Sequence, residues 1–406
     1  MIRRVAYLTI HTSPLAQPGV GEAGGMNVYL DELARTLASR GVQVEVFTRA
    51  TSAGWPAEVE LRPGYRVVHI RAGPRRRLSI PRLAGWVDTF ADGVVNWAHE
   101  HGSSYDVVHS HYWLSGWAGV MVKKALGIPL ANSFHTLGRV KEAHRRPDEP
   151  PESLLRIAAE KEVIERSDCL VASTPAESED LMERYGADPA KLCVSPPGVD
   201  HELFRPGPRG EARRFLGLGD QPLLLFVGRI QPSKGMDVAV GALRILAEQI
   251  PDVGMLVVGG PSGPRGSTEL ARMRERISRA GLAGRVRFLA PQPQRSLPVL
   301  YQAADVLLVP SRTESFGLVA VEAQACGLPV VAAKVGGLVY AVDSGRSGLL
   351  VEGHQPADYA AAAGRIITDP HLARRLGEGG IRWAEDFSWQ AAGQRMLELY
   401  EGIGQA

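Results

Sequence analysis

Short runs of apolar residues, many of them β-branched, alternate along the chain with segments whose apolar positions recur at helical spacing. Most of these runs lack strict alternation with polar residues, which is typical of strands buried on both faces of a mostly parallel sheet. Helices are predicted over 236–249 and 268–280, and another from Leu318. Strands are predicted at 5–10, 44–48, 67–70, 107–109, 130–133, 170–172, 192–194, 223–227, 255–259, 286–289, 306–310 and 330–332.

The alternation is interrupted near 204–220, where proline and glycine cluster. A strand–helix series on each side of such a joint predicts two doubly wound α/β domains, so the expected fold class is α/β with two Rossmann-like parallel sheets facing a cleft. The expected domains are 1–205 and 206–385. Residues 386–406 are expected to form a helix that returns to the first domain.

Length and composition agree with this division. A chain of 406 residues exceeds the ~250–300 residues at which single cores stop growing. With 46 basic and 44 acidic side chains, the net charge of +2 gives no electrostatic footprint for nucleic acid. Three unpaired cysteines, no signal-peptide pattern and no stretch of ~18 apolar residues predict a cytoplasmic protein without a membrane span.

The segment Gly19-Val-Gly21-Glu-Ala-Gly24 spells a G-x-G-x-x-G pattern, but its position argues against a dinucleotide fingerprint. Gly19 lies nine residues beyond Ile10, whereas the fingerprint follows its strand directly. We therefore interpret Gly24 and Gly25 as a glycine pair before a helix, where free amides favour a phosphate. A plain flexible loop remains the alternative at this point.

Two cations follow the first predicted strand of the second domain. Arg229 and Lys234 stand five residues apart on a loop that begins at Gly228. A loop at the carboxyl end of a strand is where an anionic leaving group would be held. Lysine is scarce, with seven in the chain, and Lys234 is the one lysine between Lys191 and Lys334. We favour an anion site over two solvated cations.

Two carboxylates flank a strand-to-helix turn in the second domain. Glu314 precedes Gly317, which opens a predicted helix, and Glu322 lies inside that helix. Carboxylates in such positions can accept hydrogen bonds from sugar hydroxyls. Because its helical neighbours are apolar, Glu322 is expected to be buried with a polar partner.

Histidines stand at the ends of three strands of the first domain. His11 follows the strand at 5–10, His109-Ser-His111-Tyr112 stands at the end of the strand at 107–109, and His135-Thr136 follows the strand at 130–133. Polar residues at successive strand ends of one parallel sheet converge on one edge, which favours a site over isolated core histidines. The sequence contains no Asp-x-Asp pair, the usual magnesium clamp of metal-dependent sugar transferases. Nucleophile-elbow, zinc-protease and Walker motifs are also missing from it.

Together these residues resemble glycosyltransferase family 4, retaining enzymes of the two-domain GT-B architecture. The resemblance covers the whole chain. It rests on Gly24-Gly-Met-Asn27, on Arg229 with Lys234, and on the Glu314…Glu322 pair. It is strongest for a branch that moves N-acetylglucosamine from UDP to an inositol phosphate. The resemblance implies an acceptor-binding first domain, a nucleotide-sugar-binding second domain and a UDP-sugar co-substrate without a cofactor or metal. A homodimer is the oligomeric state that analogy suggests.

The resemblance also implies roles for individual residues. Arg229, Lys234, Glu314 and His135 would be the catalytic set, with the two cations on the donor diphosphate and His135 beside the donor sugar. Glu322 would bind the ribose. The remaining expected donor-binding residues are Gly24, Gly25, Gly228, Ser315, Phe316, Gly317 and Leu318. The expected acceptor-binding residues are His11, Asn27, Tyr112, Thr136 and Arg156.

Two positions depart from that branch. It carries a lysine where this chain has Ile80, and an arginine at the position that aligns with Leu155, next to Arg156. A shift of one residue turns a helical side chain by about 100°. The sequence therefore leaves open whether the acceptor is phosphorylated, and whether the donor sugar is N-acetylglucosamine or glucose. A sucrose-phosphate- or sucrose-synthase-like transferase and a non-catalytic nucleotide-sugar-binding protein are the alternatives.

Overall fold

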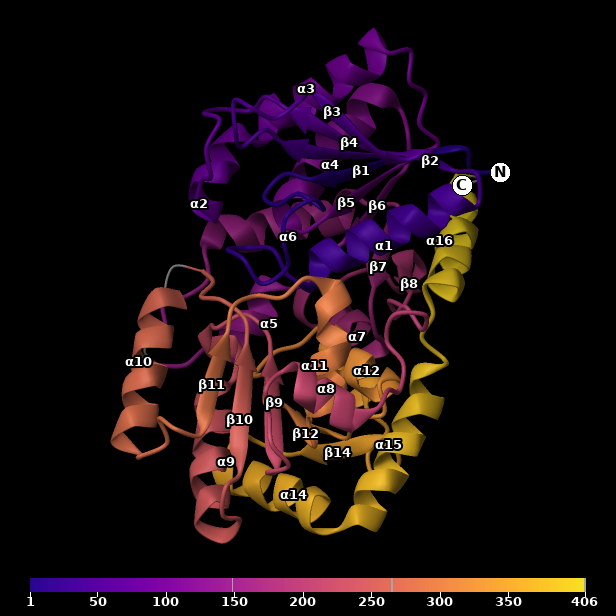
Figure 1. The fold of residues 1–406 in the computed structure, drawn as a ribbon. Helices are drawn as coiled ribbons and strands as arrows, with labels where there is room; N and C mark the ends of the chain where they lie inside the picture. The colour runs from indigo at the N-terminus through magenta and orange to yellow at the C-terminus, as the bar shows by residue number, and fades with distance from the viewer. Residues whose placement is uncertain (148, 264–265, 405–406) are drawn as a thin grey trace. The chain divides into compact units, whose positions relative to one another are not determined.

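The computed structural model describes residues 1–147, 149–263 and 266–404. They form two compact α/β units (Figure 1). Unit 1 comprises Met1–Ala16, Met26–Pro196 and Trp389–Ala406, and unit 2 comprises Gln17–Gly25 and Pro197–Ser388. Each unit has its own parallel sheet and its own buried apolar core, which confirms the predicted fold class.

The sheet of unit 1 has the strand order β3-β4-β2-β1-β5-β6-β7-β8. Every pairing is parallel except that of β3 with β4. The edge strand β3 was missed by the sequence because its residues alternate between exposed and half-buried, so it carries no buried apolar run. The strands are β1 (Arg4–Thr9), β2 (Gln43–Arg49), β3 (Glu58–Arg62), β4 (Tyr65–Ile70), β5 (Val107–His111), β6 (Leu130–Ser133), β7 (Cys169–Ala172) and β8 (Leu192–Val194).

The helices of unit 1 follow from local signals and from apolar faces turned toward the sheet. Helix α4 ends at Gly127, which adopts a left-handed φ of 67°, and Thr174 caps α7 by accepting from the Glu177 amide. The last helix packs on the first, where Gly393 approaches Thr36. The helices are α1 (Gly25–Ser39), α2 (Ile80–Leu83), α3 (Val87–Glu100), α4 (Trp113–Leu126), α5 (Gly138–Ala143), α6 (Leu154–Arg166), α7 (Pro175–Tyr185) and α16 (Trp389–Ile403).

The sheet of unit 2 has the order β11-β10-β9-β12-β13-β14, and all its pairings are parallel. The strands are β9 (Leu223–Val227), β10 (Gly254–Val258), β11 (Val286–Leu289), β12 (Val306–Val309), β13 (Val330–Ala333) and β14 (Gly348–Val351). The helices are α8 (Arg209–Phe215), α9 (Met236–Gln249), α10 (Gly266–Arg279), α11 (Leu297–Ala303), α12 (Leu318–Ala325), α13 (Leu338–Ala341), α14 (Pro356–Thr368) and α15 (Pro370–Ala384). The sequence did not predict β14, whose central residues are half-buried.

The unit boundaries differ from the expected ones in three places. Unit 2 begins at Pro197 rather than at residue 206, because Val199 already hydrogen-bonds Phe387 and packs in the core of unit 2. Residues Gln17–Gly25, expected in the first domain, group with unit 2. The last segment, which was expected to return to the first domain from residue 386, begins at Trp389 and belongs to unit 1. Among the described helices, none has the length and apolar character needed to span a membrane.

Candidate functional site

In unit 2, the loop after β9 brings one of the predicted cations next to a predicted carboxylate. Lys234 lies in a short 3-10 turn before α9, and its Nζ donates to Glu314 Oε2 over 2.6 Å. Both side chains are partly exposed, at 23% and 17%. Ser311 also donates to Glu314 Oε2, over 3.3 Å. The structure therefore joins two residues that the sequence assigned to neighbouring parts of a donor site.

Close backbone approaches fix the position of Lys234. Gly235 follows it with φ 69°, and a Cβ there would lie 1.9 Å from the Pro310 carbonyl oxygen, so a larger residue would displace the loop. Arg312 adds a bidentate ion pair with Asp237, at 2.8 and 3.0 Å, which ties the loop after β12 to the start of α9. The Lys234 and Glu314 loops are thus held together by backbone fit and by a second ion pair.

The other predicted cation, Arg229, lies beside the glycine pair. A Cβ on Gly24 would come within 3.2 Å of Arg229 Nε, so the missing side chain leaves room for the guanidinium. Arg229 Nη1 donates to Ser262 Oγ over 3.3 Å and lies 3.7 Å from a Glu22 carboxylate oxygen. Gly228 precedes it in extended backbone. The sequence placed Gly24 and Arg229 in different domains, whereas both belong to unit 2.

The loop that carries Glu314 leads directly into α12. Gly317 is the residue before that helix, with φ 103°, so the first amides of α12 lie next to the loop. Phe316 is buried, and its ring packs edge-on against Phe387 at 5.5 Å, which makes its side chain part of the core. Leu318 lies next to Gly25, where a Cβ would stand 3.5 Å from its Cδ1. Ser315 is partly buried in the same loop.

Two glycines that the sequence analysis missed support this loop. A Cβ on Gly336 would meet the Glu314 carbonyl oxygen at 2.4 Å, and one on Gly337 would meet the Ser315 carbonyl oxygen at 2.1 Å. The Gly337 amide donates to the Glu314 carbonyl over 2.8 Å. The available signal was the glycine pair in the loop that follows the predicted strand at 330–332.

Glu322 is buried with partners, as expected. Only 4% of it is exposed, and it accepts from the Tyr301 hydroxyl at 2.7 Å and from Gln294 Nε2 at 2.8 Å. Burial raises its pKa to about 7, although both hydrogen bonds act in the opposite direction. Glu322 can thus change its charge near neutral pH. No pattern in the sequence identified Gln294 or Tyr301 as its partners.

In unit 1, the predicted residues at strand ends lie at one edge of the sheet. β5 ends at His111 and is followed by Tyr112, while β6 ends at Ser133 and is followed closely by His135 and Thr136. The register pairs His111 with Ser133. Both Tyr112 and His135 have positive φ, at 77° and 58°, a strained backbone that is enriched at functional sites.

The histidines at this edge are linked by hydrogen bonds. His111 Nδ1 lies 3.0 Å from His135 Nε2, while His109 bonds the Tyr400 hydroxyl at 2.6 Å and Ser133 Oγ at 2.9 Å. Burial lowers the pKa of His109 and of His135 to about 3, and that of His111 well below its usual value. All three rings are therefore neutral at physiological pH.

Arg156, rather than Leu155, is the side chain that α6 directs at the Tyr112–Thr136 edge. Arg156 Nη2 donates to the Thr136 carbonyl at 2.9 Å and to its hydroxyl at 3.2 Å, and the guanidinium lies 5.3 Å from the centre of the Tyr112 ring. Leu155 is 46% exposed. Ion pairs to Glu160 at 2.8 Å and to Glu152 at 3.2 Å accompany this buried cation.

Charge balance around Arg156 keeps it ionised. Burial opposes its charge, but Tyr112, Glu160 and Glu152 outweigh that effect and raise the pKa of Arg156. Lys141 is a second cation here, and its Nζ lies 3.7 Å from a Glu152 carboxylate oxygen. The negative charges of Glu152 and Glu160 therefore balance the positive charges of Arg156 and Lys141. This part of unit 1 thus combines two cations with two carboxylates.

The remaining predicted acceptor residues lie close to β1. The ring of His11 stacks obliquely on Tyr112, with centroids 4.5 Å apart. Asn27, on the first turn of α1, is buried and donates to Thr12 Oγ1 at 2.8 Å and to the Ser13 carbonyl at 2.6 Å. Asn27 therefore holds the loop after β1, while His11 extends the Tyr112–Arg156 stack. Ile80, at the start of α2, packs against the core of unit 1.

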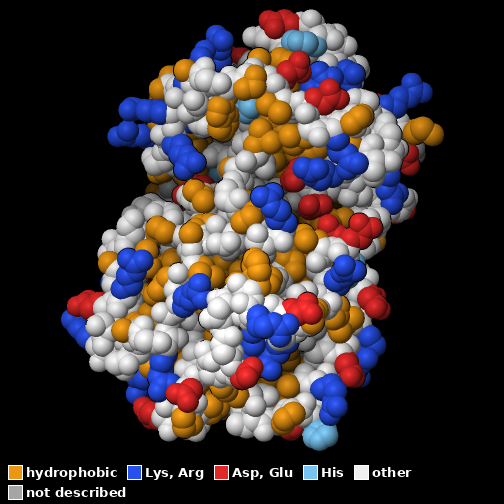
Figure 2. Space-filling model, viewed as in Figure 1, with side chains coloured by type: hydrophobic (Ala, Val, Ile, Leu, Met, Phe, Trp, Pro, Cys, Tyr) orange, Lys and Arg blue, Asp and Glu red, His pale blue; other side chains and the backbone are white. Residues whose placement is uncertain are grey.

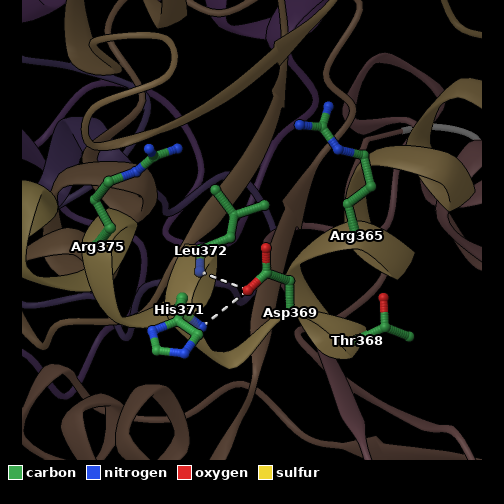
Figure 3. Close-up of a pocket in the computed structure, with 6 residues that line it drawn as sticks. All are labelled: Arg365, Thr368, Asp369, His371, Leu372 and Arg375. Carbon is green, nitrogen blue, oxygen red and sulfur yellow. Dashed lines mark hydrogen bonds between the residues drawn. The ribbon is translucent and has the colours of Figure 1, made fainter.

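A separate surface pocket lies on unit 2 near the α14–α15 junction and contains none of the predicted residues (Figure 3). Arg365 and Arg375 line it, but Asp369 caps α15 there by accepting from the amides of His371 and Leu372 at 3.0 and 3.1 Å. On the face drawn in Figure 2, basic and acidic side chains are interspersed. Within the described ranges, no group of three or more His, Cys, Asp or Glu side chains is arranged to hold a metal ion.

Two family models match the chain. "Glycosyltransferase Family 4" matches residues 23–203, and "Glycosyl transferases group 1" matches residues 208–383. Similar curated proteins carry the name D-inositol 3-phosphate glycosyltransferase. One from Actinosynnema mirum is 49% identical, over 98% of this chain and 97% of its own. Another, from Catenulispora acidiphila, is 47% identical, over 98% and 94%.

Solved structures show the same architecture. A sucrose-phosphate synthase from Thermosynechococcus elongatus is 33% identical, with a TM-score of 0.91 over 99% of both chains. Anabaena HepE, crystallised with UDP and glucose, is 22% identical, with a TM-score of 0.79 over 98% of this chain and 100% of its own, which is a likeness of fold.

Proposed function

We propose, from the premise that this chain belongs to glycosyltransferase family 4, that it moves N-acetylglucosamine or glucose from a UDP-sugar to a small polyhydroxylated acceptor with retention of anomeric configuration. The binding of the UDP-sugar donor is supported by the group of charged residues and glycines on the loops of unit 2. There, Lys234 pairs with Glu314, and Arg229 lies beside Gly24.

The donor would bind by an exchange of partners. Its diphosphate would take over Lys234, which now pairs with Glu314, and would also draw Arg229 from Glu22. The amide of Gly25 and the first amides of α12 would add hydrogen bonds to the anion. Glu314, released from Lys234, would accept hydrogen bonds from the sugar hydroxyls. Glu322 would accept those of the ribose.

In the proposed reaction, the acceptor hydroxyl oxygen forms a bond to the anomeric carbon as the bond from that carbon to the diphosphate oxygen breaks. The hydroxyl proton passes to the departing phosphate oxygen on the same face of the sugar, so UDP leaves and the configuration is kept. Lys234 and Arg229 would stabilise the charge that develops on the diphosphate. His135 would position the donor sugar. No metal is required in this scheme, in line with the absence of an Asp-x-Asp pair from the sequence.

The acceptor would bind at the Tyr112–Thr136–Arg156 edge of unit 1, near His11 and Asn27. The names of the relatives support an inositol phosphate. Arg156 supplies a cation at this edge, yet two carboxylates balance it and Lys141. An unphosphorylated polyol is therefore the second acceptor class to test. The likeness to a sucrose-phosphate synthase supports a third, a phosphorylated ketohexose.

The test is UDP release by the purified full chain from UDP-N-acetylglucosamine and from UDP-glucose. Inositol 3-phosphate, inositol and fructose phosphate are offered separately, with and without a chelator. We expect acceptor-dependent UDP release that survives chelation, and NMR of the product should show the anomeric configuration of the donor. Binding of UDP-sugar without turnover for any acceptor would contradict the proposal and favour a non-catalytic binding protein. An inverted product would overturn the retaining mechanism.

A further inference from the structure

His354 connects the loop after β14 to the loop that carries Glu314. The side chain is partly buried and follows Val351, the last residue of β14, within unit 2. Its Nε2 lies 3.1 Å from the carbonyl oxygen of Ser311, which follows β12 in the same sheet. Because a carbonyl oxygen can only accept, Nε2 carries a proton and donates it.

The peptide unit between Ser311 and Arg312 is hydrogen-bonded at both of its polar groups. Its carbonyl accepts from His354, and its amide donates to the Ser233 carbonyl over 2.7 Å. Because a peptide unit is planar, bonds to its two opposite sides fix its orientation. One bond comes from the loop after β14, and the other comes from the short turn that contains Lys234. The loop after β12 is therefore held between two neighbouring loops of unit 2.

Ser311 connects this peptide to the Glu314 carboxylate. Ser311 is 2% exposed, and its hydroxyl donates to Glu314 Oε2 over 3.3 Å, while Lys234 Nζ contacts the same oxygen at 2.6 Å. Within the described residues, these are the two hydrogen bonds of that carboxylate. When the diphosphate of the proposed donor takes Lys234, the Ser311 hydroxyl is the partner that remains. The backbone that His354 holds sets the position of this hydroxyl.

We propose that His354 is a positioning residue for the transfer of the sugar. By holding the Ser311 carbonyl, it keeps the Ser311 hydroxyl directed at Glu314 while that carboxylate binds the sugar hydroxyls. The anchoring rests on hydrogen bonds within unit 2, whereas its effect on turnover rests on the proposed function. His354 itself does not contact the substrate, because its effect passes through Ser311.

The first measurement tests the anchor without any reaction. Amide hydrogen exchange of the 15N-labelled full chain is followed by NMR without ligand, in the wild type, His354→Phe and His354→Gln. His354→Phe lacks the donor, so we expect exchange of the Arg312 amide to become roughly fivefold faster. His354→Gln retains an N–H near the same position and should restore the slow exchange. The Gly337 amide, which bonds the Glu314 carbonyl, should exchange at the same rate throughout.

Turnover of the UDP-sugar should follow the anchor. We expect His354→Phe to lower kcat roughly fivefold, the size of one net hydrogen bond, and His354→Gln to recover most of it. Affinity for UDP, which lacks the sugar, should be unchanged in both variants. His201→Phe is the matched control, because His201 Nε2 also donates to a backbone carbonyl of unit 2, that of Phe387, at 3.0 Å. It should leave kcat and the exchange of the Arg312 amide unchanged.

A double variant shows whether His354 acts through Ser311. Ser311→Ala removes the hydroxyl but keeps the backbone carbonyl, and it should lower kcat by a factor similar to that of His354→Phe. Because both changes interrupt the same connection to Glu314, the double variant should be no slower than the slower single variant.

The outcomes separate the two claims. Wild-type exchange of the Arg312 amide in His354→Phe, or equal losses of kcat in the Phe and Gln variants, would overturn the positioning role. Losses that multiply in the double variant would overturn it as well. Faster exchange in His354→Phe that the Gln variant reverses, in a chain that releases no UDP with any acceptor, would leave the anchor standing and remove the proposed function instead.

Discussion

Unit 1 and unit 2 each hold a cation next to a carboxylate at their candidate site, but the two pairs differ in burial. The Arg156 and Glu160 side chains are 4% and 0% exposed, and Arg156 bonds three groups besides Glu160. Lys234 and Glu314 are 23% and 17% exposed. A buried pair with further hydrogen bonds is fixed by the cost of leaving either charge alone, whereas a partly hydrated pair can change partners. The ion pair of unit 1 is therefore fixed in place, whereas the residues of the ion pair of unit 2 can exchange partners.

The largest expected effect is on the stability of unit 1. Arg156→Leu leaves Glu160 buried without its cation, so we expect a loss of about 3–5 kcal/mol in the free energy of unfolding. Urea denaturation followed by fluorescence measures it. Arg184→Leu is the matched control, because Arg184 makes a partly exposed i,i+4 pair with Asp180 in the same unit, at 35% and 23%, and should cost less than about 1 kcal/mol. Similar losses for both variants would contradict the difference between the two pairs.

The next effect is on activity and arises in unit 2. Lys234→Ala removes a charge-assisted contact to the proposed diphosphate. We therefore expect kcat/KM for the donor to fall roughly 10- to 100-fold, because the activation free energy rises by about 1.5–3 kcal/mol. Stability should change by less than about 1 kcal/mol, because the pair is partly exposed. Lys334→Ala, which breaks an exposed pair with Glu352 in the same unit, should leave kcat/KM unchanged. A strongly destabilised but active Lys234→Ala chain would reverse the comparison.

The smallest effect is a pH dependence. Glu322 binds its proton more tightly in the folded state, where its pKa is about 7, than in the unfolded state, where its pKa is about 4.5. The free energy of unfolding therefore falls as the pH rises from about 4.5 toward 7. Glu322→Gln should therefore gain about 1–2 kcal/mol relative to the wild type between pH 5 and 7, measured by denaturation at each pH. The gain should level off above pH 8.

Glu177 is the counterpart of Glu322 in unit 1. It is also buried, and burial raises its pKa to about 7. Glu177→Gln should show the same dependence of stability on pH. If Glu322 binds the ribose, only Glu322→Gln should also weaken donor binding. Equal KM values for the donor in the two variants would remove Glu322 from the proposed site.

Residues next to predicted strands and turns could be located from the sequence, because apolar runs mark strands and loops at their carboxyl ends follow from parallel topology. The positions of Lys234, Glu314 and His135 in loops after β9, β12 and β6 were predicted in this way, while their roles stay predictions. The grouping of Gly24 with Arg229 was not, because it depends on which core residues 17–25 join. The partners of Glu322 were also missed, because Gln294 and Tyr301 reach it from separate elements.

Arg156 shows a different limit. The sequence analysis named Arg156 as an acceptor-binding residue, although Leu155 is the position that aligns with the arginine of the related branch. Only the orientation of the helix could show which of the two neighbours faces Thr136. The edge strand β3 was missed for a related reason. Its stability comes from pairing with β4 rather than from burial, and pairing leaves no apolar run in the sequence.

The hydrogen bonds of Tyr400 have a consequence for synthesis of the chain. Its hydroxyl bonds His109 on β5 and Tyr7 on β1, two strands in the centre of the sheet of unit 1. The ribosome makes those strands long before α16. Until the last helix emerges, His109 and Tyr7 lack their partner, and the face that α16 covers stays open to water. Unit 1, although it is begun first, can complete its core only after all of unit 2 has been translated.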